Sequence, residues 1–268
     1  MVLNFITSHS NSVCKQVVSL QQRKHRKNTG LFVLEGLRSV KDALAAGWVP
    51  EYYMVTDDFL HQPGGEQLIV GLSETNVTGY RVTDPLMKKM AETETPQGLL
   101  CVFHQPVHDV NKIICNPEGF WLVLDRIQDP GNLGTLIRSA EAAGVSGIFL
   151  THGSTDPYNA KALRAATGAV LHLPVVELTQ EQSDCQFLFN AGIHMVGAAL
   201  QKGKPYGQVA YQRPLALVIG NEANGIDQAL LAKVESRVTI PMRGRLQSLN
   251  AAIAGSILLF HIAEMVHQ

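Results

Sequence analysis

The sequence lacks the residue patterns of several common protein classes. Its four cysteines, Cys14, Cys101, Cys115 and Cys185, form no CxxC pair, and its ten histidines form no HExxH pattern. We therefore expect no disulfide framework, no metal site, and reduced thiols, as in a cytoplasmic protein. The first residues show no basic segment followed by an apolar run, so we expect no signal peptide. The longest apolar stretch, residues 251–262, is too short to span a bilayer.

Three signatures of nucleotide-binding proteins and hydrolases are also missing. The sequence contains no GxxxxGK followed by Ser or Thr and no GxSxG, and no GxGxxG follows a predicted strand. The absence of the last pattern disfavours a nicotinamide-dependent dehydrogenase, although the order of elements described below suits that class.

Charge is scarce overall and unevenly placed. Charged residues make up 17% of the chain and the net charge is −1, which argues against a general nucleic-acid coat protein. The first 48 residues nevertheless carry seven basic and two acidic side chains, a net charge of +5. This asymmetry predicts a basic surface on the front part of the chain.

A length of 268 residues with 46% hydrophobic residues suits two domains. We predict a smaller N-terminal α/β domain over residues 1–106, a linker over 107–117 and a C-terminal α/β domain over 118–268. In the rear domain, five apolar segments of strand length alternate with helical segments, which is typical of a parallel sheet covered by helices. The predicted strands are residues 120–124, 147–150, 193–196, 215–219 and 238–240.

Polar side chains follow three of these predicted strands. Open α/β sheets bind ligands at the carboxyl ends of their strands, so these segments are candidate site segments. After the first strand comes a glycine-rich turn with Asn132, near the start of a helix that carries Arg138. The alternative is an ordinary helix start, in which Asn132 caps free N–H groups and Arg138 is a surface residue.

The second segment, LVIGNEANGI, leads from a strand into a polar turn. Gly220 lets the backbone approach a ligand closely, and Glu222 is a carboxylate just past the strand end. A tight turn with solvated acids is the alternative.

The third segment, IPMRGRLQSLNAAIAG, leads into a terminal helix predicted over residues 246–266. Ser248 or a neighbour caps this helix, and Asn250 lies in its first turn. Small residues at 251–256 permit close packing of another backbone, and a helix in a crowded core is the alternative. The apolar face predicted from spacings of three and four consists of Leu249, Ile253, Ile257 and Phe260.

In this order, DPGNLGTLIRSAEAAG, LVIGNEANGI and IPMRGRLQSLNAA resemble the three motifs of the SpoU (TrmH-type) branch of the SPOUT RNA methyltransferases. In the front domain, FVLEGLRSVKDAL and TETPQGLLCVF resemble the ribosomal-protein-like substrate-binding domain often fused ahead of them. The resemblance implies S-adenosylmethionine-dependent methylation of an RNA ribose 2′-hydroxyl. It also implies a trefoil knot in the C-terminal parallel sheet domain and a homodimer whose active site takes residues from both subunits.

The resemblance assigns roles to individual positions. The catalytic residues would be Asn132, Arg138, Glu222, Ser248 and Asn250. The residues lining S-adenosylmethionine would be Ala198, Ala199, Leu200, Gly220, Asn221, Ile240, Met242 and Leu249. RNA phosphates would be held by Arg23, Lys24, Arg26 and Lys27, for which a solvated helix end is the alternative.

The chemistry limits what an arginine can do in this reaction. A guanidinium stays protonated, so Arg138 is a poor free base. We expect it to grip an RNA phosphate and to stabilise alkoxide charge as it develops on the ribose oxygen. Glu222 would orient Arg138 or a partner through a charge-assisted hydrogen bond. Asn132, Ser248 and Asn250 would position the ribose and the loops.

The substrate and the activity leave alternatives open. Ribosomal RNA is favoured because pure transfer RNA enzymes of the resembled family often carry short terminal extensions in place of a front domain. A transfer RNA 2′-O-methyltransferase is one alternative, and a non-catalytic RNA-binding ribosome-assembly factor is another. The presence of Asn132, Arg138, Glu222 and Asn250 argues against the second.

Overall fold

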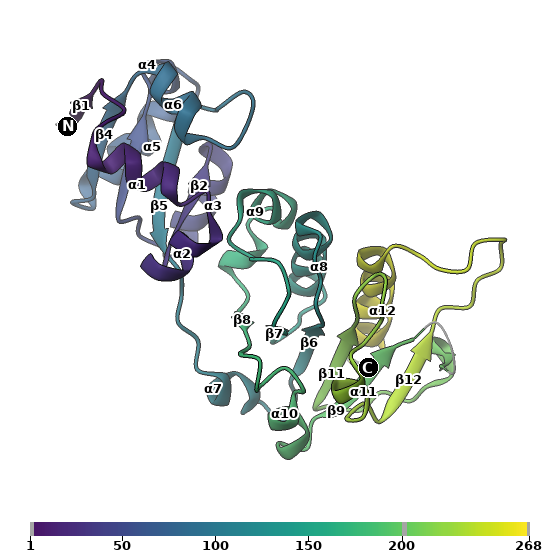
Figure 1. The fold of residues 1–268 in the computed structure, drawn as a ribbon. Coiled ribbons are helices and arrows are strands. Elements are labelled where there is room, and N and C mark those ends of the chain that lie inside the picture. The colour runs from purple at the N-terminus through teal and green to yellow at the C-terminus, as the bar shows by residue number, and fades with distance from the viewer. Residues whose placement is uncertain (1–2, 200–202, 267–268) are drawn as a thin grey trace. The chain divides into compact units, whose positions relative to one another are not determined.

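Residues 3–199 and 203–266 are described by a computed structural model of the chain (Figure 1). The chain divides into two compact units. The first extends to Pro106 and includes Tyr158–Leu163, and the second contains the remainder from Val107 onward. The stretch expected as a linker contains a short helix, α7 (Val110–Ile114), whose apolar side chains pack against the core of the second unit.

The first unit is a mixed α/β layer. Its strands are β1 (Asn4–Ile6), β2 (Leu31–Glu35), β3 (Tyr52–Val55), β4 (Thr78–Val82) and β5 (Leu99–His104). Its helices are α1 (Ser12–Ser19), α2 (Arg23–Thr29), α3 (Leu37–Ala45), α4 (Asp57–Leu60), α5 (Gly65–Glu74) and α6 (Asp84–Met90).

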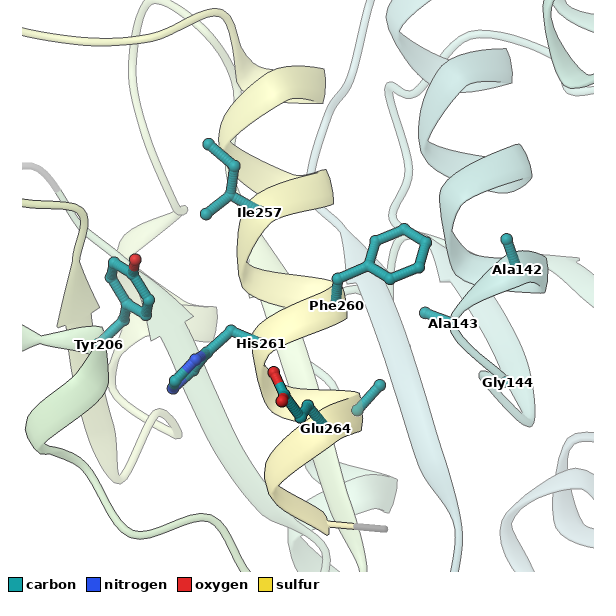
Figure 2. A pocket seen from close by; sticks show the side chains of 9 residues that line it. Ala142, Ala143, Gly144, Tyr206, Ile257, Phe260, His261 and Glu264 are labelled. Atoms are coloured by element: carbon teal, nitrogen blue, oxygen red, sulfur yellow. The ribbon is translucent and has the colours of Figure 1, made fainter.

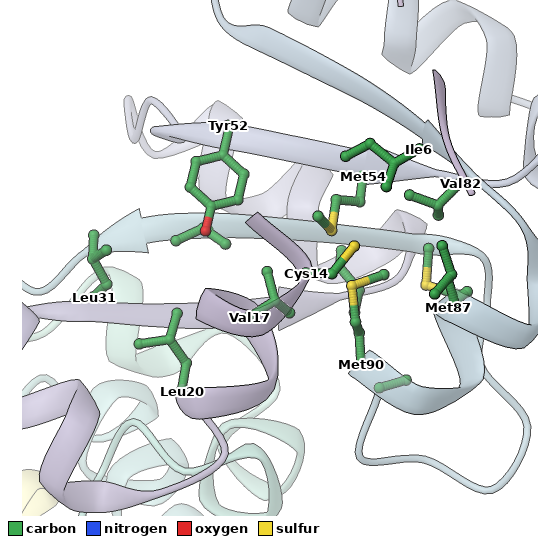
Figure 3. Packing of buried hydrophobic residues seen from close by; sticks show 14 residues of the cluster. Ile6, Cys14, Val17, Leu20, Leu31, Tyr52, Met54, Val82, Met87 and Met90 are labelled. Atoms are coloured by element: carbon green, nitrogen blue, oxygen red, sulfur yellow. The ribbon is translucent and has the colours of Figure 1, made fainter. Parts of the chain in front are cut away.

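The sheet of this unit has the order β1-β4-β3-β5-β2 within the described residues, with β1, β4 and β3 parallel and β5 antiparallel to both of its neighbours. Figure 3 shows α1 and α6 packed on one face, where Cys14 and Val17 meet Met54 and Met87. Cys14 and Val17 are three residues apart on α1, so one face of this short helix supplies both contacts.

The second unit contains the larger sheet. Its strands are β6 (Phe120–Leu124), β7 (Gly147–Leu150), β8 (Val175–Glu177), β9 (His194–Ala198), β10 (Lys204–Pro205), β11 (Leu215–Ile219) and β12 (Ser236–Thr239). Its longer helices are α8 (Pro130–Ala142) and α12 (Ala251–Val266), and its shorter ones are α7, α10 (Gln186–Asn190), α11 (Gln228–Leu231) and the 3-10 turns at Ala169–Leu171 (η1) and Tyr206–Gln208 (η2). The helix α9 (Ala160–Ala166) begins in the segment grouped with the first unit, and its last residues, from Arg164, belong to the second.

Every strand pair in this sheet is parallel within the described residues, and the order is β10-β12-β9-β11-β6-β7-β8. The central strands β6 and β11 are apolar throughout and fully buried, because helices cover both faces. The predicted parallel α/β sheet is confirmed. The knot implied by the resemblance stays a prediction.

The terminal helix begins later than predicted. α12 starts at Ala251, not near residue 246, and Asn250 precedes it as its cap. Three residues of the predicted apolar face, Ile253, Ile257 and Phe260, are 53%, 37% and 51% exposed and so do not face the core. The buried side of the helix is instead formed by Ala252, Gly255, Leu258, Leu259, Ile262 and Ala263. None of the helices in the described ranges has both the length and the apolar character needed to cross a bilayer.

Candidate functional site

The carboxyl ends of adjacent strands bring the three motifs to one edge of the larger sheet. β12, β9, β11 and β6 are neighbours in that order, and the last residues of β11 and β6, Ile219 and Leu124, are paired in register. The segments that follow these strands therefore begin side by side (Figure 1). This is the edge at which open α/β sheets bind ligands.

One side chain from each motif meets at this edge. The Nδ2 of Asn132 donates to Oε1 of Glu222 at 2.8 Å, and the Nδ2 of Asn250 donates to Oδ1 of Asn132 at 3.0 Å. The carboxylate therefore fixes which way the Asn132 amide points. Asn132 does not cap its own helix, because Asp129 does so by accepting from the Asn132 backbone N–H at 2.8 Å.

Close packing of α12 on α8 holds the third member of this group in place. Oδ1 of Asn250 accepts the free N–H groups of Ala252 and Ile253 at 2.9 and 3.2 Å, so the amide is tied to the helix start. Further along, an added Cβ at Gly255 would overlap the Leu136 side chain of α8. The small residues predicted to allow close backbone packing thus do so against α8.

Arg138 lies apart from this group. It is exposed on α8, and its Nη1 donates to Oγ1 of Thr167 at 3.4 Å. Six residues separate it from Asn132, which places the two about 120° apart around the helix axis. Within one chain, Glu222 therefore orients Asn132 and not Arg138.

Sequence reasoning missed a second polar group beneath the Glu222 turn. The buried carboxylate of Asp125 accepts from Oγ1 of Thr151 at 2.8 Å and from the backbone N–H of Asp227 at 2.7 Å. The guanidinium of Arg126 donates to Asp125 Oδ2 at 3.0 Å, and its Nη1 lies 3.5 Å from Oδ2 of Asp227. The available signal was an aspartate directly after a fully apolar strand.

The expected cofactor contacts fall at the same strand ends. Ala198 ends β9, and the N–H of Ala199 donates to the Val238 carbonyl at 2.9 Å. Gly220 is buried after β11, where an added Cβ would overlap the backbone of Gly225. Asn221 differs from a simple backbone contact, because its buried side chain donates to the Arg126 carbonyl at 2.9 Å. Leu200 lies outside the described residues.

The third motif is only partly assembled. Residues 240–250 form a long connection between β12 and α12, seen in yellow in Figure 1. Ser248 is exposed in it and makes no hydrogen bond to Asn132, Glu222 or Asn250, so this residue of the expected polar pair is not brought to the group. Ile240, Met242 and Leu249 lie half-buried in the same connection.

A separate pocket of about 680 Å³ lies between the end of α8, η2 and the second half of α12 (Figure 2). Tyr206, His261 and Glu264 supply its polar groups, and the rings of Tyr206 and His261 meet edge to face at 4.7 Å. The exposed side chains of Ile257 and Phe260 complete its apolar wall.

The basic residues of α2 differ in their exposure to solvent. Arg23, Lys24 and Lys27 are exposed, as a phosphate-binding role requires. The prediction for Arg26 is wrong, because its side chain is 4% exposed and its Nη1 donates to the carbonyls of Leu20 and Gln21 at 2.6 and 2.9 Å. It satisfies carbonyls at the end of α1 and is turned away from solvent.

Two further basic residues lie near this helix and were not predicted. Lys88 and Lys89 are exposed in the last turn of α6. The side-chain amide of Gln21, between α1 and α2, donates to the Lys89 and Met90 carbonyls at 3.4 and 3.2 Å. A basic doublet at a helix end was the available signal. Among the described residues no group of three or more His, Cys, Asp or Glu side chains is arranged to hold a metal ion.

Two family models match the chain in the positions of the two units. The SpoU rRNA Methylase family matches residues 119–260, and the MRM3-like substrate binding domain matches residues 11–101. The chain is 35% identical to the 23S rRNA (guanosine(2553)-2'-O)-methyltransferase RlmP of Bacillus subtilis, over 96% of this chain and 98% of that protein.

Solved structures resemble the whole fold. The AdoMet-bound rRNA methyltransferase from Sinorhizobium meliloti has a TM-score of 0.87 and 32% identity, with 98% of each chain covered. The SpoU methyltransferase AviRb from Streptomyces viridochromogenes, in complex with the cofactor AdoMet, has a TM-score of 0.85 and 25% identity, covering 95% of this chain and 97% of that one. The motifs, the sheet and these matches agree, and the chain belongs to the SpoU rRNA methylase family.

Proposed function

We propose that this protein transfers the methyl group of S-adenosylmethionine to a ribose 2′-hydroxyl of ribosomal RNA of the 23S type. The observation that carries the proposal is the hydrogen-bonded group of Asn132, Glu222 and Asn250 at the carboxyl edge of the sheet. Membership of the SpoU family and the similarity to the 23S rRNA 2'-O-methyltransferase of Bacillus subtilis support it. Such a substrate suits a cytoplasmic enzyme.

The residues at the edge fit S-adenosylmethionine by their chemistry. The ends of β9 and β11 offer backbone N–H and C=O groups at Ala198 and Gly220, which can pair with the polar edge of an adenine. Ile240 and Leu249 offer apolar surface to its faces, and Glu222 offers a carboxylate near a cationic ligand. When bound, S-adenosylmethionine supplies a methyl group on a sulfonium that leaves as a neutral thioether.

The polar group positions the ribose. Asn132 uses one Nδ2 hydrogen toward Glu222 and one Oδ1 lone pair toward Asn250. The other hydrogen and the other lone pair remain to hold a sugar hydroxyl in a fixed orientation. Holding the attacking oxygen in line with the methyl group supplies up to about 7–11 kcal/mol of the barrier reduction.

Arg138 acts on the charge of the substrate. Its guanidinium stays protonated, so it grips an RNA phosphate and stabilises the developing alkoxide. Because Arg138 lies apart from Asn132 within one chain, we place it in the site of a second protomer. The exposed apolar stripe of Ile253, Ile257 and Phe260 on α12, beside the pocket of Figure 2, supports a symmetric homodimer.

The function is tested by transfer of labelled methyl groups to purified RNA. Ribosomal RNA from cells lacking the protein should accept label on a ribose 2′-oxygen, and transfer RNA should not. Label on transfer RNA alone would favour the alternative substrate. Absence of transfer to either RNA, with RNA binding intact, would favour a non-catalytic assembly factor and overturn the proposal.

The shared site is tested by mixing defective protomers. Arg138→Ala should lower kcat by about 10²–10³-fold while S-adenosylmethionine binding stays unchanged, and Arg81→Ala, in an exposed ion pair elsewhere, should do neither. Co-expression of Arg138→Ala and Glu222→Ala chains should restore activity to about a quarter of the wild-type value, because one site in four is intact in a random mixture of symmetric dimers. A mixture as inactive as its parents would contradict the shared site.

A further inference from the structure

We infer that Asp125 and Arg126 form a positioning clamp that sets Glu222 against Asn132. The inference rests on the proposed function, and it assigns a role to two residues that are not among the expected catalytic, cofactor-binding or RNA-binding residues. The clamp is defined as Asp125, Arg126 and their contacts to the turn of residues 221–227, which carries Glu222.

The turn is closed on itself and then tied down at three points. Asn221 and Gly225 exchange backbone hydrogen bonds at 3.1 and 2.9 Å. Asn221 Nδ2 donates to the Arg126 carbonyl at 2.9 Å, Arg126 Nη2 donates to the Gly225 carbonyl at 3.3 Å, and the Asp227 N–H donates to Asp125 at 2.7 Å. All three ties end on two consecutive residues.

The geometry of Arg126 suits this task. Its φ of +54° lies in the left-handed region that non-glycine residues rarely adopt. The backbone turn carries its carbonyl toward Asn221 while its side chain reaches Asp125, Gly225 and Asp227. A strained residue that makes contacts of both kinds is consistent with a position set by the site.

Opposite charges and donors on several segments hold the pair in place. Asp125 is 2% exposed and accepts hydrogen bonds from Thr151, Asp227 and Arg126, so its carboxylate is held by donors on three segments. Arg126 is 32% exposed and lies between the carboxylates of Asp125 and Asp227. Loss of the guanidinium would leave these two carboxylates with one cation fewer between them.

The clamp connects the two halves of the polar group. Residues 125 and 126 lead within a few positions to Asp129, which caps α8 and so fixes Asn132. The same two residues hold the turn that carries Glu222. A shift of this turn by an ångström would break the 2.8 Å bond between Glu222 and Asn132, and misplacement of this size costs about 10²-fold in rate.

The decisive experiment is a double-mutant cycle on kcat with purified full-length protein. Arg126→Met should lower kcat by about 10–100-fold at saturating RNA and leave the RNA KM unchanged. In a Glu222→Ala background the same change should have almost no effect, because the group it positions is gone. Arg81→Met, in the exposed pair with Asp57, is the matched control and should leave kcat unchanged in both backgrounds.

Hydrogen exchange on the cofactor-free protein gives a readout independent of methyl transfer. Arg126→Met should speed exchange of the amides in residues 221–227 and leave those of β11 protected. Asp125→Asn, which keeps an acceptor for Asp227, should fall between wild type and Arg126→Met in both measurements. Equal costs of Arg126→Met in the two backgrounds, or faster exchange across the whole second unit, would overturn the clamp. An inactive wild-type protein would instead contradict the proposed function, since the exchange result stands without activity.

Discussion

Arg26 and Lys27 are adjacent basic residues for which we predict different roles, Arg26 in stability and Lys27 in RNA binding. The change Arg26→Met tests this difference. Arg26 Nη1 donates to the carbonyls of Leu20 and Gln21, which directly follow α1. A hydrogen bond from a charged donor contributes about 1.5–3 kcal/mol. A cation at a helix C-terminus contributes about 0.3–1 kcal/mol more.

Both hydrogen bonds are donated by the same nitrogen, Nη1, so their contributions to the free energy of unfolding do not add in full. We expect Arg26→Met to lower the free energy of unfolding by about 2–4 kcal/mol. In a domain of about 100 residues each kcal/mol shifts Tm by about 4–8 °C, so the change is readily seen by calorimetry. The slope of log K against log salt for RNA binding should stay as in the wild type, because a buried guanidinium reaches no phosphate.

Lys27→Met is the matched comparison. Its side chain is exposed, so stability should change by less than about 0.5 kcal/mol. Loss of one phosphate contact should reduce the salt slope by about 0.7–0.9. If Arg26→Met flattened the salt dependence and left Tm in place, the assignment of Arg26 to the end of α1 would be wrong.

Three further outcomes are expected. Gly255→Ala should lower the free energy of unfolding in urea by about 1–3 kcal/mol, because the added Cβ overlaps the Leu136 side chain. Gly71→Ala in α5, where the added Cβ meets open space, should raise it by about 0.5–1 kcal/mol. A more stable Gly255→Ala protein would contradict the packing of α12 on α8. Iodoacetamide at about pH 8 should add one adduct per native chain, at the exposed Cys115. The other three thiols are buried, which raises the pKa of Cys14 and Cys101 and raises that of Cys185 to about 12. A second adduct in the mass spectrum would argue against this burial. Asn250→Asp should keep the cap of α12 and lose turnover, since a carboxylate accepts from the helix N–H groups but cannot donate to Asn132. Asn250→Ala should lose turnover and also about 1 kcal/mol of stability, because the cap is gone. Turnover near wild type in Asn250→Asp would refute the need for the Asn250–Asn132 hydrogen bond.

The rear sheet was predictable where burial is complete on both faces. The strands at 120–124, 147–150 and 215–219 have the predicted bounds, because continuous apolar runs end at polar turns. In the first unit, β1 and β4 are mixed in polarity, and they form through pairing between positions such as Asn4 and Tyr80. Such pairing leaves little local signal.

The residues of the polar group could be predicted from the sequence, but the helix start and the long-range contacts around them could not. Asn132, Glu222 and Asn250 do meet, although their catalytic roles stay predictions. The start of α12 was placed five residues early because the leucines at 246 and 249 continue the helical spacing, while the polar amide of Asn250 ends the turn before it. The contact between Asp125 and Asp227 joins residues 102 positions apart, which no local pattern encodes.

The residues of the polar group are also far apart along the chain, which has a consequence for biosynthesis. Asn132 and Asn250 are 118 residues apart, so a ribosome adding about 5–20 residues per second needs about 6–24 s to travel from one codon to the other. During this interval the nascent chain already carries Asn132 but lacks Asn250, whose amide completes the polar group. Translation that stops within this interval therefore releases chains in which Asn132 lacks its Asn250 partner, and the polar group can form only after the start of α12 has been made.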